Sequence, residues 1–278
     1  KGRKEKRLWT ENGTGDKVNF RQFQSGFEEA EFVAGEIGRK VRTGENHYRD
    51  FAVLYRTNAQ SRLFEEKFLL ANIPYKIVGG VNFYGRKEIK DLLAYMKTVD
   101  NSLDDLAVQR SITVPRRGIG AATNGKVEAY AAEQDIHFYD ALLEADYIPG
   151  LGRAAAKIRP FTLFIQSLRS QLEYLSVKEL LEKIIEDTGY VKELEAEDTE
   201  EARARIENID EFISKAADYE ASAAESSLSG FLQEVALVAD IDSVEEGSDY
   251  VLLMTLHSAK GLEFDHVYMA GMEDGLFP

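Results

Sequence analysis

The sequence predicts an α/β fold in which a parallel sheet is interrupted by a large, mainly α-helical insertion. Strand-like and helix-like segments alternate as far as Gly80. From there to Gly247 the apolar residues recur at helical spacing, and two short apolar strands follow. Such alternation is typical of parallel sheets, and a helical block bracketed by α/β segments is what an inserted domain produces. We therefore expect sheet residues in 1–79 and 248–278 and the insertion in 80–247.

The first part of the chain predicts a hairpin, a helix, and then a strand, a helix and a strand. The expected strands are Arg7–Glu11, Val18–Gln22, Phe51–Tyr55 and Tyr75–Val78, and the expected helices are Phe27–Arg42 and Gln60–Ala71. The third of these strands is a continuous run of strand-forming apolar residues, FAVLY, which indicates a strand buried on both faces.

The middle of the chain predicts helices with short connections. They are expected at Glu88–Val99, Leu103–Ile112, Asn124–Glu133, Phe138–Ala145, Ala154–Leu175, Val177–Thr188, Glu200–Ser222 and Ser229–Val238. Glu245–Ser248 is polar and contains glycine, which suits a hinge at the exit of the insertion. Val251–Leu256 and His266–Ala270 then have the character of buried strands.

Composition excludes several classes of protein. The chain contains no cysteine, so disulfides and thiolate metal sites are impossible, and its four histidines show no ligand spacing with one another. No apolar run approaches the roughly 20 residues of a membrane span. The basic N-terminus is not followed by the apolar core of an export signal. We expect a cytoplasmic protein with no membrane contact and no structural metal.

The net charge of −15 at first argues against nucleic acid, which requires a positive surface. The charge is polarised along the chain, however. Residues 192–225 contain twelve acidic and four basic residues, whereas 106–127 contain four basic residues and no acid. The acidic stretch fits a solvated helix face, and the basic stretch leaves room for a phosphate contact.

The most informative polar cluster follows the strand at 251–256. Thr255, His257 and Ser258, followed by Lys260, Gly261 and Glu263, place hydroxyl, imidazole, ammonium and carboxylate groups where that strand ends. Ligands of open α/β folds bind at the carboxyl ends of the strands. A polar turn between two strands explains the same residues equally well.

A second polar cluster follows the strand at 51–55. Arg56 and Asn58 would reach the same edge of the sheet, where they suit a sugar-phosphate backbone. The alternative is a helix cap formed by Thr57 or Asn58, with Arg56 on the surface.

A third candidate site is the turn Gly118-Ile119-Gly120, which follows Arg116 and Arg117. Its glycines would expose backbone N–H groups and its isoleucine would pack inward, so that the turn and the next helix could hold a phosphate. A plain tight turn between helices is the alternative.

Two other glycine patterns imitate nucleotide sites. Gly120–Lys126 matches the pattern of a phosphate-binding P-loop, but the next residue is Val127, whereas a P-loop has a Ser or Thr there to bind magnesium. Gly150-Leu151-Gly152 imitates a dinucleotide fingerprint, but it lacks the βαβ frame and predicts a turn between helices. The single tryptophan, Trp9, fits packing better than base stacking.

Residues 250–268, YVLLMTLHSAKGLEFDHVY, resemble motif V of the PcrA/UvrD/Rep helicases of superfamily 1 nearly residue for residue. Residues 51–66 and 79–96 resemble the second motor domain of the same family, and the resemblance extends over essentially the whole chain. It implies part of a RecA-like motor domain, 2A, interrupted by the helical domain 2B. It also implies an internal fragment of an ATP-dependent 3′–5′ DNA helicase.

The resemblance assigns roles to the residues of the first two clusters. Gly261 and Glu263 would bind ATP, with the carboxylate on the ribose. Thr255 and His257 would contact single-stranded DNA, as would Arg56 and Asn58.

The resemblance also implies that the turn Gly118, Ile119 and Gly120 holds duplex DNA together with Arg116 and Arg117. No complete catalytic site is expected in this chain, because the P-loop and the ligands of Mg²⁺ would lie in other segments of the helicase. Those segments, namely the first motor domain and the C-terminal part of 2A, are the expected partners besides DNA. The chain alone is expected to be inactive.

Three other functions fit parts of the sequence. A non-enzymatic DNA-binding or partner-binding module could use the helical turn alone. A helicase-nuclease subunit of the same superfamily is a nearer alternative, although the compact insertion and the close similarity of residues 51–99 to PcrA-type helicases argue against it. A degenerate ATPase that uses Gly120–Lys126 fits least well.

Overall fold

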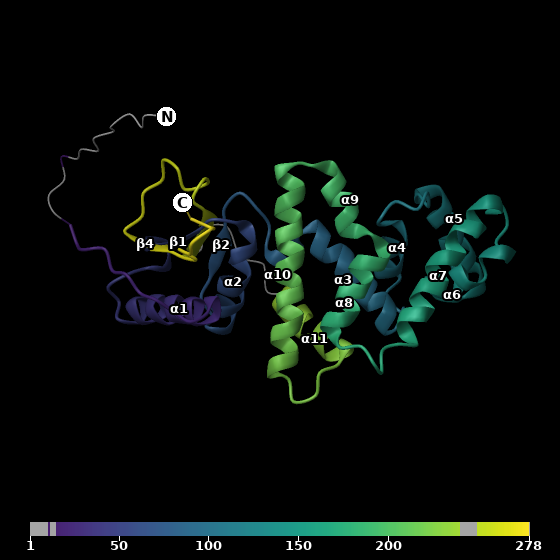
Figure 1. The fold of residues 1–278 in the computed structure, drawn as a ribbon, viewed down its shortest axis with the longest axis horizontal. Coiled ribbons are helices and arrows are strands. Elements are labelled where there is room, and N and C mark those ends of the chain that lie inside the picture. The colour runs from purple at the N-terminus through teal and green to yellow at the C-terminus, as the bar shows by residue number, and fades with distance from the viewer. Residues whose placement is uncertain (1–10, 12–14, 240–248, 278) are drawn as a thin grey trace.

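The computed structural model describes residues 11, 15–239 and 249–277. A small sheet with two covering helices lies at one end of the molecule, and a larger group of helices extends from it (Figure 1). The mixed α/β class with a parallel sheet is confirmed. None of the helices in the described ranges has the length and apolar character needed to cross a membrane.

Four parallel strands form the sheet, in the order β2-β3-β1-β4. They are β1 Phe51–Tyr55, β2 Tyr75–Ile77, β3 Val251–Thr255 and β4 His266–Met269. β1 has a strand on each side and all five of its residues are buried, which explains its continuous apolar sequence. β2 and β3 are neighbours in the sheet, so the whole helical block lies within a single connection between adjacent strands.

The two faces of the sheet are covered differently. Helices α1 (Gly26–Arg42) and α2 (Ser61–Leu70) bury one face in a core with residues such as Phe51 and Phe68. The other face has a small apolar cluster around Leu54 and Met254. The side chains that cover it belong to the connection from β3 to β4 and to the end of β2, and they are Leu256, Ala259, Phe264 and Val78. This second face is therefore covered thinly.

Nine α-helices build the block between β2 and β3 in the described residues. They are α3 Lys87–Asp100, α4 Asp105–Thr113, α5 Ala121–Gln134, α6 Phe138–Leu143, α7 Ala155–Arg169, α8 Val177–Thr188, α9 Tyr190–Glu197, α10 Glu200–Ser222 and α11 Leu228–Ala239. Short 3-10 turns lie at η1 Tyr48–Asp50, η2 Asn58–Gln60, η3 Phe83–Gly85, η4 Ala145–Tyr147 and η5 Gly152–Ala154.

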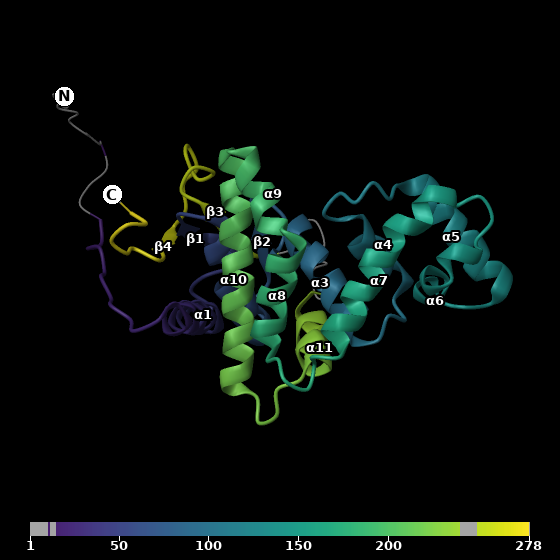
Figure 2. The same ribbon diagram turned by 45° about the vertical axis from the view of Figure 1, so that its right-hand side comes forward.

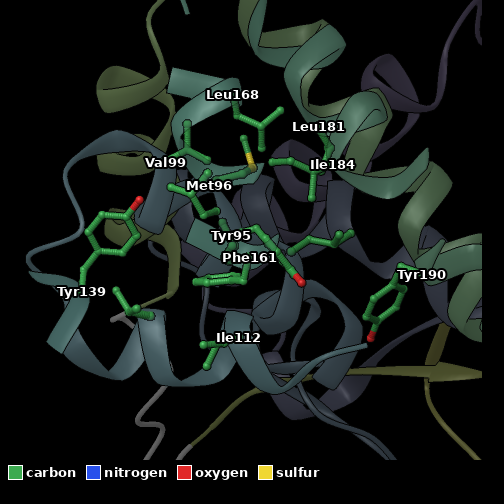
Figure 3. Packing of buried hydrophobic residues seen from close by; sticks show 14 of the residues in the cluster. Tyr95, Met96, Val99, Ile112, Tyr139, Phe161, Leu168, Leu181, Ile184 and Tyr190 are labelled. Carbon is green, nitrogen blue, oxygen red and sulfur yellow. The ribbon is translucent and has the colours of Figure 1, made fainter. Parts of the chain in front are cut away.

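The block has its own core, separate from those of the sheet. Tyr95 and Met96 on α3 meet Phe161 on α7, with Leu181 and Ile184 of α8 nearby (Figure 3). All members of this core lie between residues 83 and 235, whereas the two cores of the sheet use residues outside that range.

Side-chain caps explain where several of these helices begin. Ser176 and Glu179 form a reciprocal capping box at the start of α8. At the start of α4, the carboxylate of Asp104 accepts a hydrogen bond from the backbone N–H of Ala107 at 3.0 Å and pairs with Lys97 at 3.1 Å. Burial alone would raise the pKa of Asp104, but these two contacts lower it below its ordinary value.

Polar contacts join the block to the sheet part through α10. Arg62 on α2 is almost fully buried and pairs with Glu66 of its own helix and with Glu211 and Asp218 of α10. Lys215 of α10 reaches back to Glu66. In both views α10 runs beside the sheet part (Figure 1 and Figure 2).

The structure corrects several predicted elements. Val18–Gln22 is not a strand, because no partner strand pairs with it among the described residues and Val18 is 97% exposed. Most of Arg7–Glu11, including Trp9, lies outside the described residues, and so does the whole of the expected hinge Glu245–Ser248. α7 ends at Arg169 rather than at Leu175.

Helix α9 (Tyr190–Glu197) was not predicted. Gly189 ends α8 with a φ of 68° and directly precedes α9, so the helix restarts after a single left-handed residue. Of the eight residues of α9 only Tyr190 and Leu194 are buried, which leaves a weak periodic signal in the sequence.

Candidate functional site

The carboxyl ends of β1 and β3 meet at one edge of the sheet. Tyr55 is in register with Thr255, and the backbone N–H of Leu256 donates to the carbonyl of Tyr55 at 2.9 Å. The segments that follow the two strands therefore leave the sheet side by side, although 200 residues separate them in the sequence.

Arg56 and His257 are the first exposed side chains beyond these strand ends. Nη1 of Arg56 lies 3.3 Å from Nδ1 of His257. Asn58 follows at the start of η2 and is also exposed. The structure thus brings together three of the residues that the sequence predicts to contact single-stranded DNA. A guanidinium, an imidazole and an amide at one edge suit phosphate and sugar oxygens.

Thr255 supports the turn at this edge. Its hydroxyl accepts a hydrogen bond from the backbone N–H of Ser258 at 3.3 Å and lies 3.0 Å from the hydroxyl of Ser258. A Cβ added to Gly79 would lie 3.5 Å from that same hydroxyl, so the loop after β2 reaches the same place. Loops from three neighbouring strands therefore converge at the predicted site.

Gly261 and Glu263 lie farther along the connection from β3 to β4. Because β1, β3 and β4 run in the same direction, this connection must return from the carboxyl edge to the amino edge of the sheet. Its apolar residues, including Phe264, pack on the thinly covered face of the sheet, so Gly261 and Glu263 belong to a connection that passes over that face. Gly261 has a φ of 89° and Glu263 is exposed.

The turn Gly118-Ile119-Gly120 lies far from this edge. It directly precedes α5, which both views place at the end of the molecule remote from the strands (Figure 1 and Figure 2). Gly118 has a φ of 68°, and Ile119 is 5% exposed and belongs to the core of the block. Both glycines are exposed, and Nζ of Lys157 donates to the carbonyl of Gly118 at 3.3 Å.

The two arginines before this turn differ. Arg116 is exposed, whereas the guanidinium of Arg117 points inward. It donates to the carbonyls of Ser111 and Val114 at 3.1 and 3.0 Å and to the hydroxyl of Tyr95. Burial raises the pKa of Tyr95 to about 12, so this hydroxyl stays protonated. Arg117, predicted as a duplex contact, is thus bound to the end of α4 here, because these carbonyls have no helical partner.

A family model of the UvrD-like helicase C-terminal domain matches residues 1–278. The chain belongs to this family. The match covers both the sheet part and the helical block, and it agrees with the helicase resemblance of residues 250–268.

Two helicases are similar to this chain over nearly its whole length. The ATP-dependent DNA helicase PcrA of Staphylococcus aureus is 47% identical over 278 residues, which is 99% of this chain and 38% of the relative. The ATP-dependent DNA helicase PcrA of Bacillus subtilis is 44% identical over 282 residues, again 99% of this chain and 38% of the relative. The chain thus spans well under half the length of the relatives that it matches.

For this UvrD-like chain, the apparent P-loop has another explanation. Residues Ala121–Gln134 form α5, so Gly125 and Lys126 lie within a helix and not in a loop. Nζ of Lys126 donates to the carbonyl of Gly150, in the turn between helices that the sequence predicts there. Among the described residues no group of three or more His, Cys, Asp or Glu side chains could hold a metal ion.

Two further residues shape the strand-end site formed by Arg56, Asn58, Thr255 and His257. Oε1 of Gln60 accepts hydrogen bonds from the backbone N–H groups of Arg56 and Thr57 at 2.9 and 3.0 Å. Arg86 donates to the carbonyl of Asn58 at 3.0 Å. The contacts of Gln60 are local and match the Thr-x-x-Gln pattern of a capping box, whereas the contact of Arg86 joins segments 28 residues apart in the sequence.

Proposed function

We propose that this chain is part of an ATP-dependent 3′–5′ DNA helicase or translocase, in which it supplies one side of the motor and the inserted helical domain. The observation that carries the proposal is the convergence of Arg56, Asn58, Thr255 and His257 at the shared edge of β1 and β3 in a UvrD-like chain.

The residues at this edge would hold the sugar-phosphate backbone of single-stranded DNA. Arg56 supplies positive charge, and Asn58 and His257 supply hydrogen-bonding groups in exposed positions. Contacts to the backbone do not depend on the base sequence, and a translocase must bind every sequence along which it moves. The small hydroxyl of Thr255 would hold the turn and present its free lone pair to the strand.

Gly261 and Glu263 would contribute to the nucleotide site. A Cβ at Gly261 would meet no atom within 4 Å, so the backbone there is open to a ligand. The exposed carboxylate of Glu263 suits the hydroxyls of a ribose. These features fit ATP, whose hydrolysis would supply the free energy for movement. The P-loop and the ligands of Mg²⁺ would come from other segments of the helicase.

The turn Gly118–Gly120 would hold the backbone of duplex DNA. Its exposed glycines and the start of α5 present backbone N–H groups, and exposed Arg116 adds positive charge. We assign Arg117 to support of the turn, because its guanidinium is occupied by backbone carbonyls.

The separate cores support a division of labour along the chain. We propose that residues 1–79 and 248–278 belong to motor domain 2A and residues 80–247 to the inserted domain 2B. The thinly covered face of the sheet, which carries Gly261 and Glu263, would then receive the first motor domain.

A chimaera tests this proposal. This chain would replace the corresponding 38% of the Staphylococcus aureus relative, and ATP hydrolysis would be measured with and without single-stranded DNA. We expect DNA-stimulated hydrolysis. Glu263→Gln should raise the KM for ATP roughly tenfold, because one hydrogen bond to a charged acceptor is weakened.

The isolated chain should hydrolyse no ATP. A non-enzymatic DNA-binding module would give a different pattern: salt-dependent duplex binding that depends on Gly118, with no hydrolysis by the chimaera. That pattern would replace the helicase assignment.

A further inference from the structure

The segment Arg56–Asn58 at the strand-end site is held from two sides. Gln60, within the same loop, accepts hydrogen bonds from the backbone of Arg56 and Thr57. Arg86, from the start of α3, binds the other end of the loop. Its Nη2 donates to the carbonyl of Asn58 at 3.0 Å and to the hydroxyl of Ser61 at 2.8 Å. The position of the predicted DNA contacts therefore depends on a second arginine that is itself 7% exposed.

Arg86 has a third partner in the helical block. Its Nη1 donates to Oδ1 of Asn208 on α10 at 2.7 Å. Nδ2 of Asn208 donates in turn to Oε1 of Glu88 at 2.6 Å. Asn208 and Glu88 are 6% and 3% exposed, so both ends of the amide are fixed by buried partners. A continuous chain of hydrogen bonds thus runs from α10 to the loop.

Breaking this chain at α10 should disturb the loop. Without Asn208, Nη1 of Arg86 would be a buried donor with no partner from α10, which is unfavourable. The guanidinium would turn toward its remaining acceptors and toward water, and the carbonyl of Asn58 would lose a well-aligned donor. The neighbouring cluster around Arg62 joins α2 to the same helix, but its bonds go to Glu66, Glu211 and Asp218 and to no atom of the loop.

We infer that Asn208 is a positioning residue: through Arg86 it sets the backbone of Arg56–Asn58, so that its hydrogen bond to Arg86 controls how tightly the strand-end site holds the sugar-phosphate backbone of single-stranded DNA. The inference rests on the proposed role of this loop. By linkage, single-stranded DNA on the loop should in turn favour the hydrogen bond between Asn208 and Arg86.

Hydrogen exchange in the 278-residue chain tests the coupling without DNA. Asn208→Ala should speed amide exchange in peptides covering residues 56–61. Arg62→Met is the matched control, since it weakens the same junction but should leave this exchange unchanged. Exchange that follows overall stability in both variants would show a merely structural role and overturn the inference.

A pair of substitutions that keeps the net charge should rebuild the hydrogen bonds of Asn208. In the double variant Asn208→Asp with Glu88→Gln, an aspartate accepts from Arg86 and a glutamine donates to it, so the chain of hydrogen bonds is rebuilt with the same net charge. Exchange at residues 56–61 should return to that of the wild type. Failure of rescue, with the double variant folded, would contradict the proposed path.

Binding of an oligodeoxythymidine to the chimaera then tests the link to DNA. Asn208→Ala should weaken binding about fivefold or more, the lower end of ordinary coupling between sites. The kcat for ATP hydrolysis at saturating DNA should stay within about twofold, because the lost contact affects binding of the strand. If Arg56→Ala binds the oligonucleotide weakly but Asn208→Ala binds it as tightly as the wild type, the inference about Asn208 is overturned and the proposed role of the loop is kept. Unchanged affinity in Arg56→Ala would instead remove the proposed role of the loop.

Discussion

Replacing Arg62 with methionine should lower the free energy of unfolding, because the carboxylates at the junction of α2 and α10 would lose a shared cation. Nε of Arg62 lies 2.7 Å from Glu211, and its Nη atoms lie 3.3 Å from Glu66 and 3.1 Å from Asp218. The side chain of Arg62 is 3% exposed. Methionine fills similar apolar space, so the substitution removes chiefly the charge and its hydrogen bonds.

The magnitude follows from the burial of each partner. Asp218 is 60% exposed, so its pair contributes little. Glu66 keeps a second cation, Lys215, at 3.3 Å. Glu211 is 23% exposed and would lose its ion pair. Breaking a buried pair costs 3–5 kcal/mol, and the partial exposure of Glu211 places the expected loss at about 3 kcal/mol.

The loss should depend on pH. Burial raises the pKa of Glu211, while Arg62 pulls it back, so the pKa should rise further in the variant. A carboxylate whose folded pKa is raised destabilises the fold when charged, and protonation relieves this as the pH falls through that pKa. The difference between variant and wild type should therefore be largest at neutral pH and shrink toward acid.

Urea denaturation of the 278-residue chain, measured across this pH range, provides the test. Adding Glu211→Gln to Arg62→Met should recover part of the loss, because it removes the unpaired charge. Lys178→Met, which breaks the exposed pair with Glu182, is the control and should cost no more than about 0.5 kcal/mol. A loss below about 1 kcal/mol at neutral pH, or a loss that grows toward acid, would show that Arg62 does not stabilise the carboxylate of Glu211 as described.

Three further predictions concern the helical block. Gly118→Ala should lower the free energy of unfolding by about 1–2 kcal/mol, because the φ of Gly118 is 68° and therefore left-handed. Gly120→Ala should lower it much less, since the φ of Gly120 is −117° and a Cβ there meets no atom within 4 Å. Urea denaturation measures both losses. Arg117→Ala should lower thermal stability, whereas Arg116→Ala should preserve it and reduce the salt dependence of duplex binding measured by fluorescence anisotropy. Asp104→Ala should cost about 1 kcal/mol at neutral pH as a lost helix cap. The pKa of Asp104 in the folded protein is lowered. The difference in free energy of unfolding between wild type and variant should therefore persist at pH values above the ordinary pKa of 3.8, and it should vanish as the pH falls through the folded pKa in acid titrations.

The regular elements could be predicted where burial makes the sequence pattern strong. β1 and α8 have the bounds that the sequence predicts, since one is apolar throughout and the other carries a capping box and a terminal glycine. Val18–Gln22 shows why the same reasoning can be wrong. Alternating residues form a strand only if a neighbour supplies backbone hydrogen bonds, and the sequence does not reveal whether one is present.

The site was predictable only in part for a related reason. Residues directly after β1 and β3 could be assigned to one edge because parallel strands share their direction. The inward turn of Arg117 and the contact between Arg86 and Asn208 depend on packing of distant helices, the latter across 122 residues of sequence. Local patterns do not encode such contacts.

The proposed function requires that this chain form one side of a motor that moves 3′ to 5′ on DNA. Unwinding by the chimaera of duplexes with either a 3′ or a 5′ single-stranded tail tests it most directly. We predict ATP-dependent unwinding of the 3′-tailed duplex, little of the 5′-tailed one, and loss of unwinding in Arg56→Ala. Equal unwinding of both substrates, or a folded chimaera that hydrolyses ATP but unwinds neither, would contradict the claim.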